Sequence, residues 1–251
     1  YRNNQLIAAS FCYEEEKEVL MEHGPLVFDN TDSTDTYDFV NTIYNLFKKP
    51  ILISIDSRFE NKLSLLRKSK FIFDFSTLLL SIPSTEKEFI SGCNENRRRI
   101  IKKVKDEKFI IDYSKDNIEE FYRIYVNRLK YKGCTEEVMP LSYFKNLVKL
   151  NGVDIIVCKK NNIIYSGMVA LRTKDYFETR YNTNNTEFIK NNANTYLEYY
   201  LISKFIKNNE VKTYDFAGID TSENAVNNGV NYYKQSYGGN LKTTTFLEFG
   251  N

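Results

Sequence analysis

The sequence predicts an α/β fold in which mixed β-sheets carry helices on both faces. Short apolar segments of strand length alternate with longer segments in which apolar residues recur every three or four positions, the period of a helix. The expected order in the second half is strand, two helices, three strands, and then helix, strand, helix and strand, so both element types run through it. The 251 residues suffice for one large domain or two small ones.

The first half is expected to alternate strands and helices. Residues 6–13 are an apolar run of strand length, and residues 51–55 (Ile-Leu-Ile-Ser-Ile) are typical of a buried strand. Between them apolar residues recur at helical steps from Tyr37 to Phe47, which predicts a helix over residues 35–48. A short helix over residues 60–69 and a strand over residues 71–80 complete this half.

A helix that begins near residue 84 is expected to precede the elements of the second half. Ser84 or Thr85, with a Glu three residues later, resembles a capping box, and the helix is expected to continue to Val104. The other expected strands cover residues 109–113, 153–159, 163–171, 176–181, 213–216 and 241–249. The other expected helices cover residues 117–131, 142–150, 194–208 and 231–237.

Composition excludes several classes of protein. Lys and Arg total 35 against 33 Asp and Glu, so a nucleic-acid site would have to be a local patch. The apolar runs are far shorter than the roughly 20 residues of a membrane helix. The four cysteines form no Cys-x-x-Cys pair and the chain has one His, so no metal site is expected. These features are typical of a reduced, cytoplasmic protein with buried thiols.

Four segments together resemble the landmarks of one family. They are Asn96-Arg-Arg-Arg-Ile-Ile-Lys-Lys103, Ala193-Asn-Thr-Tyr-Leu-Glu198, Tyr214-Asp-Phe-Ala-Gly218 and Gly229-Val-Asn-Tyr-Tyr-Lys-Gln-Ser-Tyr-Gly-Gly239. The last is similar to the Gly-x-x-x-Phe-Lys-x-x-Phe-Gly signature of the Fem-type branch of the GNAT acyltransferase superfamily. Residues 24–28 also resemble the central strand of that family's first domain.

The resemblance implies two GNAT-like domains with a cleft between them. They would be a first domain over residues 1–83, truncated at its N-terminus, and an acyltransferase domain over residues 84–251. The best-known members transfer amino acids from aminoacyl-tRNA to the peptide stem of peptidoglycan precursors. We therefore expect a bacterial N-acyltransferase or aminoacyltransferase that forms an amide on an amino group of a nucleotide- or lipid-linked cell-envelope precursor, either a peptidoglycan-type peptide or an amino sugar. The expected donor is aminoacyl-tRNA, with no bound cofactor and no covalent enzyme intermediate.

Two alternatives stay open. One is a CoA- or carrier-dependent N-acyltransferase that acts on a nucleotide-linked amino sugar for surface polysaccharide, with acetyl-CoA as co-substrate. The other is a catalytically silent GNAT-like module that binds nucleic acid or protein. Residues 190–195 lack the glycines with which CoA-using GNAT enzymes bind pyrophosphate, so CoA is disfavoured. In Fem-type enzymes that act on nucleotide-linked muropeptides, an Arg often precedes a Tyr in the corresponding segment. Residues 137–143 lack this Arg, which counts against a peptidoglycan acceptor.

Two residues are candidates for catalysis. Lys234 occupies the Lys of the family signature, where a cation stabilises the oxyanion that develops during acyl transfer. The alternative is a surface lysine on a short helix. Asp215 is expected at the end of a strand, where a carboxylate could orient or deprotonate the attacking amine. The alternative is a turn residue before Gly218.

Other residues are candidates for binding substrate. Arg180 and Tyr181 are expected at the end of a strand that lines the cleft, and Arg suits a carboxylate or phosphate. A salt bridge from Arg180 to Glu178 or Glu198 is the alternative. The resemblance adds Asn194, Tyr233 and Tyr143 to the substrate-binding candidates.

The densest basic cluster lies between residues 97 and 105. If Ile101 and Val104 face the core, the cations face outward and could contact tRNA phosphates or the diphosphate of a nucleotide-linked acceptor. The alternative is an ordinary solvated helix face. The phosphate-binding candidates are Arg97, Arg98, Arg99 and Lys102.

Overall fold

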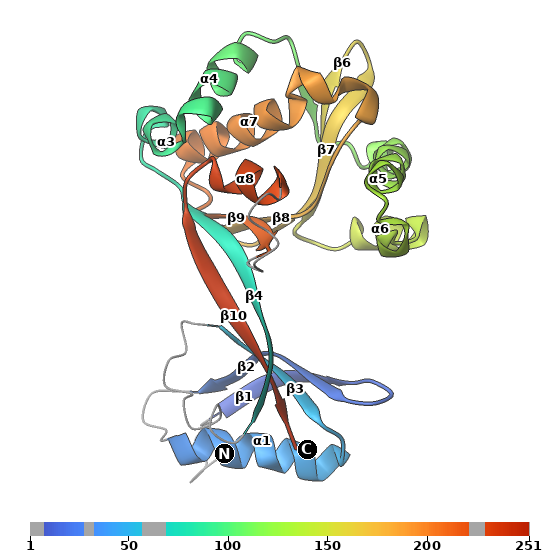
Figure 1. Cartoon of the computed structure of the whole chain (residues 1–251), viewed down its shortest axis with the longest axis vertical. Helices are drawn as coiled ribbons and strands as arrows, with labels where there is room; N and C mark the ends of the chain where they lie inside the picture. Colours follow the sequence, from blue (N-terminus) through green and yellow to red (C-terminus); the bar gives the residue numbers. More distant parts are fainter. Residues whose placement is uncertain (1–7, 28–32, 57–68, 221–228, 251) are drawn as a thin grey trace. The chain divides into compact units, whose positions relative to one another are not determined.

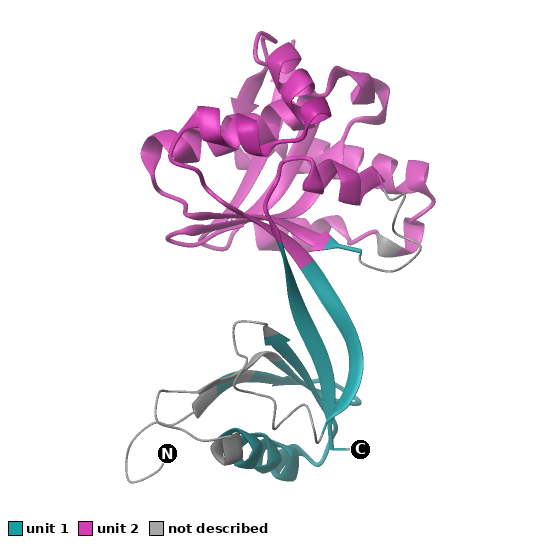
Figure 2. Cartoon of the chain, turned by 60° about the vertical axis from the view of Figure 1, so that its left-hand side comes forward, with its two compact units in different colours: residues 1–76, 219–223, 241–251 teal, residues 77–218, 224–240 magenta. Residues whose placement is uncertain are grey.

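The computed structural model describes residues 8–27, 33–56, 69–220 and 229–250. The chain divides into two compact units (Figure 2). The first unit comprises Tyr1–Ser76, Ile219–Glu223 and Leu241–Asn251, and the second comprises Thr77–Gly218 and Asn224–Asn240. The expected family-domain boundary at residues 83 and 84 stays a prediction. The compact units change over between Ser76 and Thr77, and the C-terminal residues belong to the first unit.

Among the described residues, the first unit is a sheet with the helix α1 packed on it (Figure 1). Its strands follow the order β1-β2-β3-β10-β4, with β2 parallel to β3 and antiparallel pairing between β1 and β2 and between β3 and β10. The core lies between α1 and the strands, where the rings of Tyr37 and Tyr44 meet the Phe249 ring edge-on. The elements are β1 (Ala8–Glu14), β2 (Val19–Val27), α1 (Ser33–Phe47), β3 (Ile51–Asp56), β4 (Lys70–Ser81) and β10 (Asn240–Phe249).

The second unit has helices on both faces of a mixed sheet (Figure 1). Its strands follow the order β4-β9-β8-β7-β6-β5, with β8 and β9 parallel and β5 to β8 antiparallel. The elements are β5 (Ile110–Asp112), β6 (Val153–Lys160), β7 (Ile163–Arg172), β8 (Tyr176–Asn184), β9 (Thr213–Ile219), α3 (Glu86–Gly92), α4 (Glu95–Val104), α5 (Ile118–Lys132), α6 (Leu141–Leu147), α7 (Ala193–Asn208) and α8 (Gly229–Gln235). Three short 3₁₀ helices, Lys115–Asn117, Thr135–Glu137 and Thr186–Asn191, connect them. This arrangement confirms the predicted α/β class.

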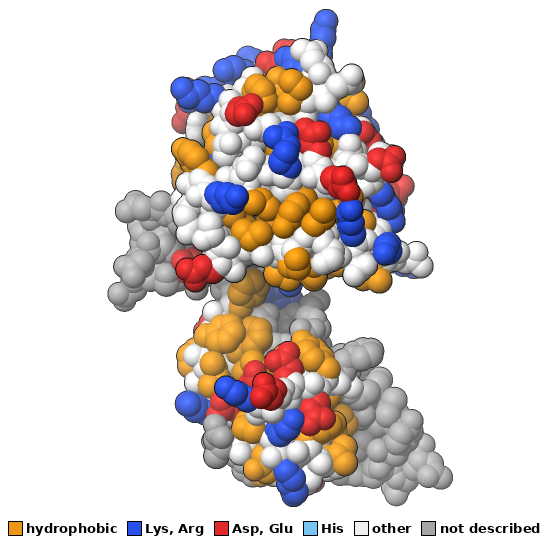
Figure 3. Space-filling model, turned by 90° about the vertical axis from the view of Figure 1, so that its right-hand side faces the viewer, with side chains coloured by type: hydrophobic (Ala, Val, Ile, Leu, Met, Phe, Trp, Pro, Cys, Tyr) orange, Lys and Arg blue, Asp and Glu red, His pale blue; other side chains and the backbone are white. Residues whose placement is uncertain are grey.

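The alternation of side chains along the strands explains why both faces are covered. Ile155 and Val157 of β6 belong to the core under α5 and α6, together with Phe121 and Phe144 of those helices. The intervening Ile156 is fully buried as well, so both faces of this strand are covered. The outer side of the unit, where α5 and α6 lie, mixes cationic, anionic and hydrophobic side chains (Figure 3).

The long helix predicted over residues 84–104 is wrong, because the structure has two helices there. Thr85 caps α3 by accepting a hydrogen bond from the Glu88 backbone N–H at 3.2 Å. Cys93 then adopts an extended conformation, and Asn94 caps α4 by accepting a 2.8 Å bond from the Arg97 N–H. The break therefore follows Gly92, and the Asn94 cap begins the second helix.

Other predicted boundaries differ by a few residues. The helix predicted over residues 60–69 lies almost entirely outside the described residues. The strand predicted over residues 176–181 continues to Asn184, and the strand predicted over residues 213–216 continues to Ile219. Within the described part of the chain, no helix has both the length and the apolar character needed to span a bilayer.

Candidate functional site

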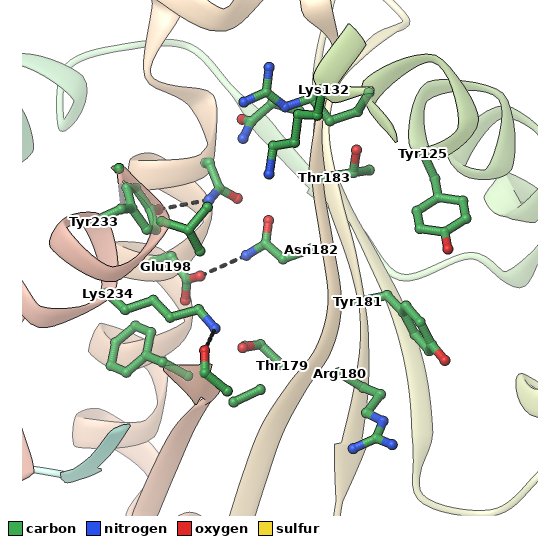
Figure 4. Close-up of a pocket in the computed structure, with 18 of the residues that line it drawn as sticks. Tyr125, Lys132, Thr179, Arg180, Tyr181, Asn182, Thr183, Glu198, Tyr233 and Lys234 are labelled. Carbon is green, nitrogen blue, oxygen red and sulfur yellow. Dashed lines mark hydrogen bonds between the residues drawn. The ribbon is translucent and has the colours of Figure 1, made fainter. Parts of the chain in front are cut away.

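The second unit contains a cavity of about 920 Å³ beside β8 (Figure 4). Residues from the end of α5, from β8, from the start of α7, from the end of β9 and from α8 line it. Four of the lining side chains are cationic: Arg128, Lys132, Arg180 and Lys234. Glu198 is the one carboxylate among the described residues of the lining. The cavity is therefore electropositive and suited to an anionic ligand.

Lys234 is held in the cavity wall by the backbone. The α8 helix brings its side chain over the end of β9, where the ammonium donates a 2.5 Å hydrogen bond to the Gly218 carbonyl (Figure 4). Burial lowers the pKa of Lys234, and the charges of Glu198 and Asp215 act in the opposite direction. The alternative of an ordinary surface lysine does not hold, because Lys234 is partly buried and lines the cavity.

Glu198 is the buried carboxylate of the site. Its side chain comes from the second turn of α7, only 1% of the residue is exposed, and its two oxygens accept hydrogen bonds from the Asn182 amide at 2.9 Å and from the Tyr214 hydroxyl. Burial raises the pKa of Glu198 to about 7, against the opposing effects of the Tyr214 bond and the charges of Arg97 and Lys234. A carboxyl group with such a pKa can accept or donate a proton near neutral pH.

Two polar atoms in the lining lack a partner among the described residues. Asn194 donates from its amide nitrogen to the Tyr233 hydroxyl at 2.8 Å, which leaves its carbonyl oxygen, Oδ1, without a donor. The Thr183 hydroxyl on β8 is also unpartnered. These residues are 7% and 2% exposed, respectively. Buried polar atoms are normally satisfied, so these two point to a ligand or to water in the cavity.

The prediction that Arg97 faces solvent is wrong. It is 4% exposed, and its guanidinium lies 4.3 Å from the ring centroid of Tyr233 and 4.4 Å from that of Tyr237. It donates to the hydroxyls of Ser236 and Thr195 at 2.8 and 2.5 Å. Arg97, Ile101 and Val104 share the buried face of α4, so Arg97 connects α4, α7 and α8 and is not on the surface where a phosphate would contact it.

The other three phosphate-binding candidates on α4 are exposed and lie outside the cavity lining. Arg98 donates to the Cys93 carbonyl at 2.5 Å, and Arg99 donates to the Asn96 side chain at 3.2 Å. Lys102 lies in the last turn of the same helix. Phosphate binding by these three residues stays a prediction.

Asp215, the predicted base, lies outside the cavity lining. Its carboxylate accepts hydrogen bonds from the hydroxyls of Thr77 and Tyr176 and, at 2.6 Å, from the Ala217 backbone N–H. Ala217 has a positive φ of 58°, which is strained for any residue with a Cβ. The alternative of a turn residue before Gly218 therefore describes this geometry, and the carboxylate that faces the cavity is Glu198.

The predicted substrate-binding residues divide into two groups. Arg180, Tyr181, Asn194 and Tyr233 line the cavity, whereas Tyr143 does not. Tyr143 instead accepts a 3.1 Å hydrogen bond from the Tyr181 hydroxyl and so supports that lining residue. Arg180 forms an ion pair with Glu178 at 3.2 Å, which is the simpler of the two interpretations of this residue.

The sequence did not single out several residues of the lining. Asn182 and Thr183 follow the point at which the strand was predicted to end. Arg128 and Lys132 lie in the last two turns of α5, on a helix recognised only for its apolar stripe. Their signal is weak, because cations near a helix C-terminus are common. From the sequence, Glu198 is a possible ion-pair partner of Arg180 and the last residue of the family segment Ala193–Glu198.

No protein-family model and no curated protein sequence matches the chain. Solved structures do match over nearly all of it. FemX has a TM-score of 0.77 at 13% identity and covers 98% of this chain and 86% of its own. The fold is the tandem GNAT-like fold of the Fem-type proteins. At this identity the likeness establishes the fold, and it confirms the family resemblance of the sequence at that level.

Two further structures show the same architecture. L-PGS from Bacillus licheniformis has a TM-score of 0.66 at 11% identity, covering 97% of this chain and 81% of its own. A tandem GNAT protein from the clavulanic acid biosynthesis pathway has a TM-score of 0.62 at 7% identity, covering 99% of this chain and 80% of its own. Both halves of the described chain are thus accounted for by one shared fold.

Proposed function

We propose that this protein is an N-acyltransferase that forms an amide between an activated acyl group and an amine in the cavity of the second unit. The observation that carries the proposal is the position of Lys234. Its ammonium lies in the cavity wall, is fixed by the Gly218 carbonyl and occupies the Lys of the Fem-type signature. A cation in this place would contact the oxygen on which negative charge develops when an amine attacks a carbonyl carbon.

The reaction would proceed by direct attack. The amine nitrogen forms a bond to the carbonyl carbon, and the carbonyl oxygen becomes an oxyanion beside Lys234. Collapse of this intermediate breaks the carbon–oxygen bond of an ester or the carbon–sulfur bond of a thioester, and the leaving group takes up a proton from the nitrogen. Lys234 keeps its protons throughout, so the enzyme itself needs no covalent intermediate.

The preferred donor is aminoacyl-tRNA. At the start of α7, where CoA-using GNAT enzymes bind pyrophosphate, Ala193 and Thr195 are each 2% exposed. The Thr195 hydroxyl is also occupied by Arg97. These observations support a donor other than CoA. A polyanionic donor is compatible with the excess of cations in the cavity lining.

The preferred acceptor is an amine on a nucleotide- or lipid-linked precursor of the cell envelope. Support comes from the shared fold with FemX and L-PGS and from Arg128 and Lys132, which give the cavity a cationic end for a phosphate or carboxylate. With aminoacyl-tRNA as donor, the reaction would take place in the cytoplasm.

The test compares donors side by side. Purified protein is titrated with deacylated tRNA and with coenzyme A across a salt series, and is then assayed for amide formation on a nucleotide-linked muramoyl peptide and on a nucleotide-linked amino sugar. We expect salt-sensitive tRNA binding, because phosphate contacts release counterions. Saturable CoA binding without tRNA binding would favour the CoA-dependent sugar N-acyltransferase instead. Binding of tRNA without amide formation from any donor would favour the silent module.

A further inference from the structure

Two hydrogen-bond acceptors on α7 face the same cavity. Asn194 and Glu198 are four residues apart on this helix, so their side chains lie on one face, one turn from each other. Both line the cavity, and both are more than nine-tenths buried. The amide nitrogen of Asn194 donates a hydrogen bond to the Tyr233 hydroxyl. The amide oxygen, Oδ1, has no hydrogen-bond partner among the described residues and can accept a bond from a ligand.

We propose that Asn194 Oδ1 and the Glu198 carboxylate form the binding site for a primary amine, the nucleophile of the acceptor. This inference rests on the proposed function and adds the chemical class that the site recognises. Each oxygen of Glu198 accepts one hydrogen bond, from Asn182 or from Tyr214, and a carboxylate oxygen can accept two. An amine is a donor of up to three hydrogen bonds, so it satisfies both Asn194 Oδ1 and the remaining capacity of Glu198.

The position of Asn194 and Glu198 relative to Lys234 indicates that the bound amine is the nucleophile. The nucleophile must lie beside the carbonyl whose oxygen contacts the Lys234 ammonium. Glu198 is close enough to Lys234 for their charges to influence each other, and Figure 4 shows both side chains entering the cavity from the α7 and α8 side. Lys132 enters from the far side, beyond Asn182 (Figure 4). An acceptor with an amine at one end and an anionic group at the other therefore spans the cavity.

The ionisation of Glu198 supports this role. With a pKa of about 7, the carboxyl group can take one proton from an incoming ammonium and release it to water, which leaves the neutral amine free to attack. Bound positive charge should in turn lower this pKa. The charged or titratable groups that influence Glu198 from the surrounding elements are Arg97, Lys234, Tyr214, Tyr233 and Tyr237.

The test uses simple probes and no acyl donor. 6-Aminohexanoate has an amine and a carboxylate, whereas hexanoate lacks the amine. Both are titrated by NMR into the whole protein, observing the side-chain amides of Asn182 and Asn194. We expect wild type to bind 6-aminohexanoate at least about tenfold more tightly than hexanoate, because hydrogen bonds to charged groups are worth this much. The preference should be greater at pH 8 than at pH 6.

Variants with matched controls decide the outcome. Glu198→Gln keeps the shape and both existing partners but should lose the preference and its pH dependence, and Asn194→Leu should reduce it. Glu187→Gln, an equal change of charge on a residue outside the lining, should retain it. Equal binding of both probes by wild type, or a preference that survives Glu198→Gln, overturns the proposal.

The source of the amine is tested separately. Alaninamide has an amine next to a carbonyl, as in the aminoacyl group of a donor. One outcome is that alaninamide binds to wild type and loses binding in Glu198→Gln while 6-aminohexanoate does not bind. In that case the site holds the amine of the donor, and the proposal that it holds the acceptor amine is overturned. The binding test measures no acyl transfer, so it is independent of the proposed function. A protein that prefers the amine probe but transfers no acyl group would support the amine site and contradict only the proposed function.

Discussion

The guanidinium of Arg97 lies over the ring of Tyr233, the residue that precedes Lys234 on α8, at 4.3 Å from the ring centroid. The guanidinium also contacts the Tyr237 ring one turn later and donates to the Tyr233 carbonyl at 3.5 Å. A cation placed between a ring of α8 and a ring of the turn that follows it fixes the position and rotation of that helix. Arg97 therefore positions Lys234 without itself lining the cavity.

Replacing Arg97 should weaken stability. Arg97→Met keeps the length of the side chain but leaves the hydroxyls of Ser236 and Thr195 without their donor. We expect the free energy of unfolding in urea to fall by about 3 kcal/mol. Arg99→Met, a change on the exposed side of the same helix, should alter it by less than about 0.5 kcal/mol. Equal losses for the two variants would contradict the structural role of the buried Arg97 contacts.

The Lys234 ammonium should be required for transfer and dispensable for folding. Lys234→Ala should lower kcat/KM by roughly 10²- to 10³-fold, the usual effect of removing one donor to an oxyanion. The far-ultraviolet circular dichroism and the midpoint of urea unfolding should stay close to those of wild type. Lys102→Ala, which removes a lysine outside the cavity lining, is the control. Unchanged kcat/KM in Lys234→Ala would remove the basis of the proposed mechanism.

Apolar periodicity was sufficient to predict the fold class but not the polar residues of the site. The helix over α7 and the three strands β6 to β8 follow patterns that burial imposes on any sequence. The sequence predicts a strand over residues 176–181, and the residues that follow, Asn182-Thr-Asn-Asn185, are rich in Asn, which has low strand propensity. Pairing with β7 nevertheless continues to Asn184, which lies opposite Ser166, so tertiary contacts override the local preference.

The charged residues of the site were harder to place for a related reason. Three consecutive arginines look alike in sequence, yet only Arg97 is in phase with Ile101 and Val104, and this spacing of four and seven residues was the available signal. Glu198 in the middle of a helix is typical of a solvent-facing residue. Its burial depends on Asn182 and Tyr214, whose proximity is decided by the sheet and not by the local sequence.

The double glycine after α8 should be essential for folding. Gly239 has a φ of +98°, and a Cβ there would lie 2.6 Å from the Leu79 carbonyl oxygen of β4. Gly239→Ala should therefore reduce the free energy of unfolding by at least about 2 kcal/mol, through strain and a backbone clash. Gly92→Ala offers a matched control, because its φ is ordinary and a Cβ there would meet nothing within 4 Å. That variant should be as stable as wild type or slightly more stable. A destabilising Gly92→Ala with a neutral Gly239→Ala would contradict the arrangement of this turn.

Glu198 should make the protein less stable as the pH rises towards neutrality. Its pKa is raised from the ordinary value of 4.5 to about 7 in the folded protein, so the folded state holds a proton that the unfolded state has lost between these two values. The favourable contribution of the protonated group is complete below pH 4.5 and is lost as the pH rises through 7. The full change is on the order of 3 kcal/mol for a group buried to this extent.

The pH effect is measured as a difference between variants, because other carboxylates titrate in the same range. Asp112 does not interfere in this window, because its hydrogen bond with Lys159 lowers its pKa to about 2 and its contribution to stability is lost only at lower pH. Urea unfolding of wild type and of Glu198→Gln is followed from pH 4.5 to pH 8, with Glu187→Gln as the control. Wild type should lose stability relative to Glu198→Gln across this window, whereas Glu187→Gln should stay parallel to wild type. A constant difference between wild type and Glu198→Gln would mean that Glu198 titrates near its ordinary pKa, and its role as a proton acceptor at neutral pH would then be excluded.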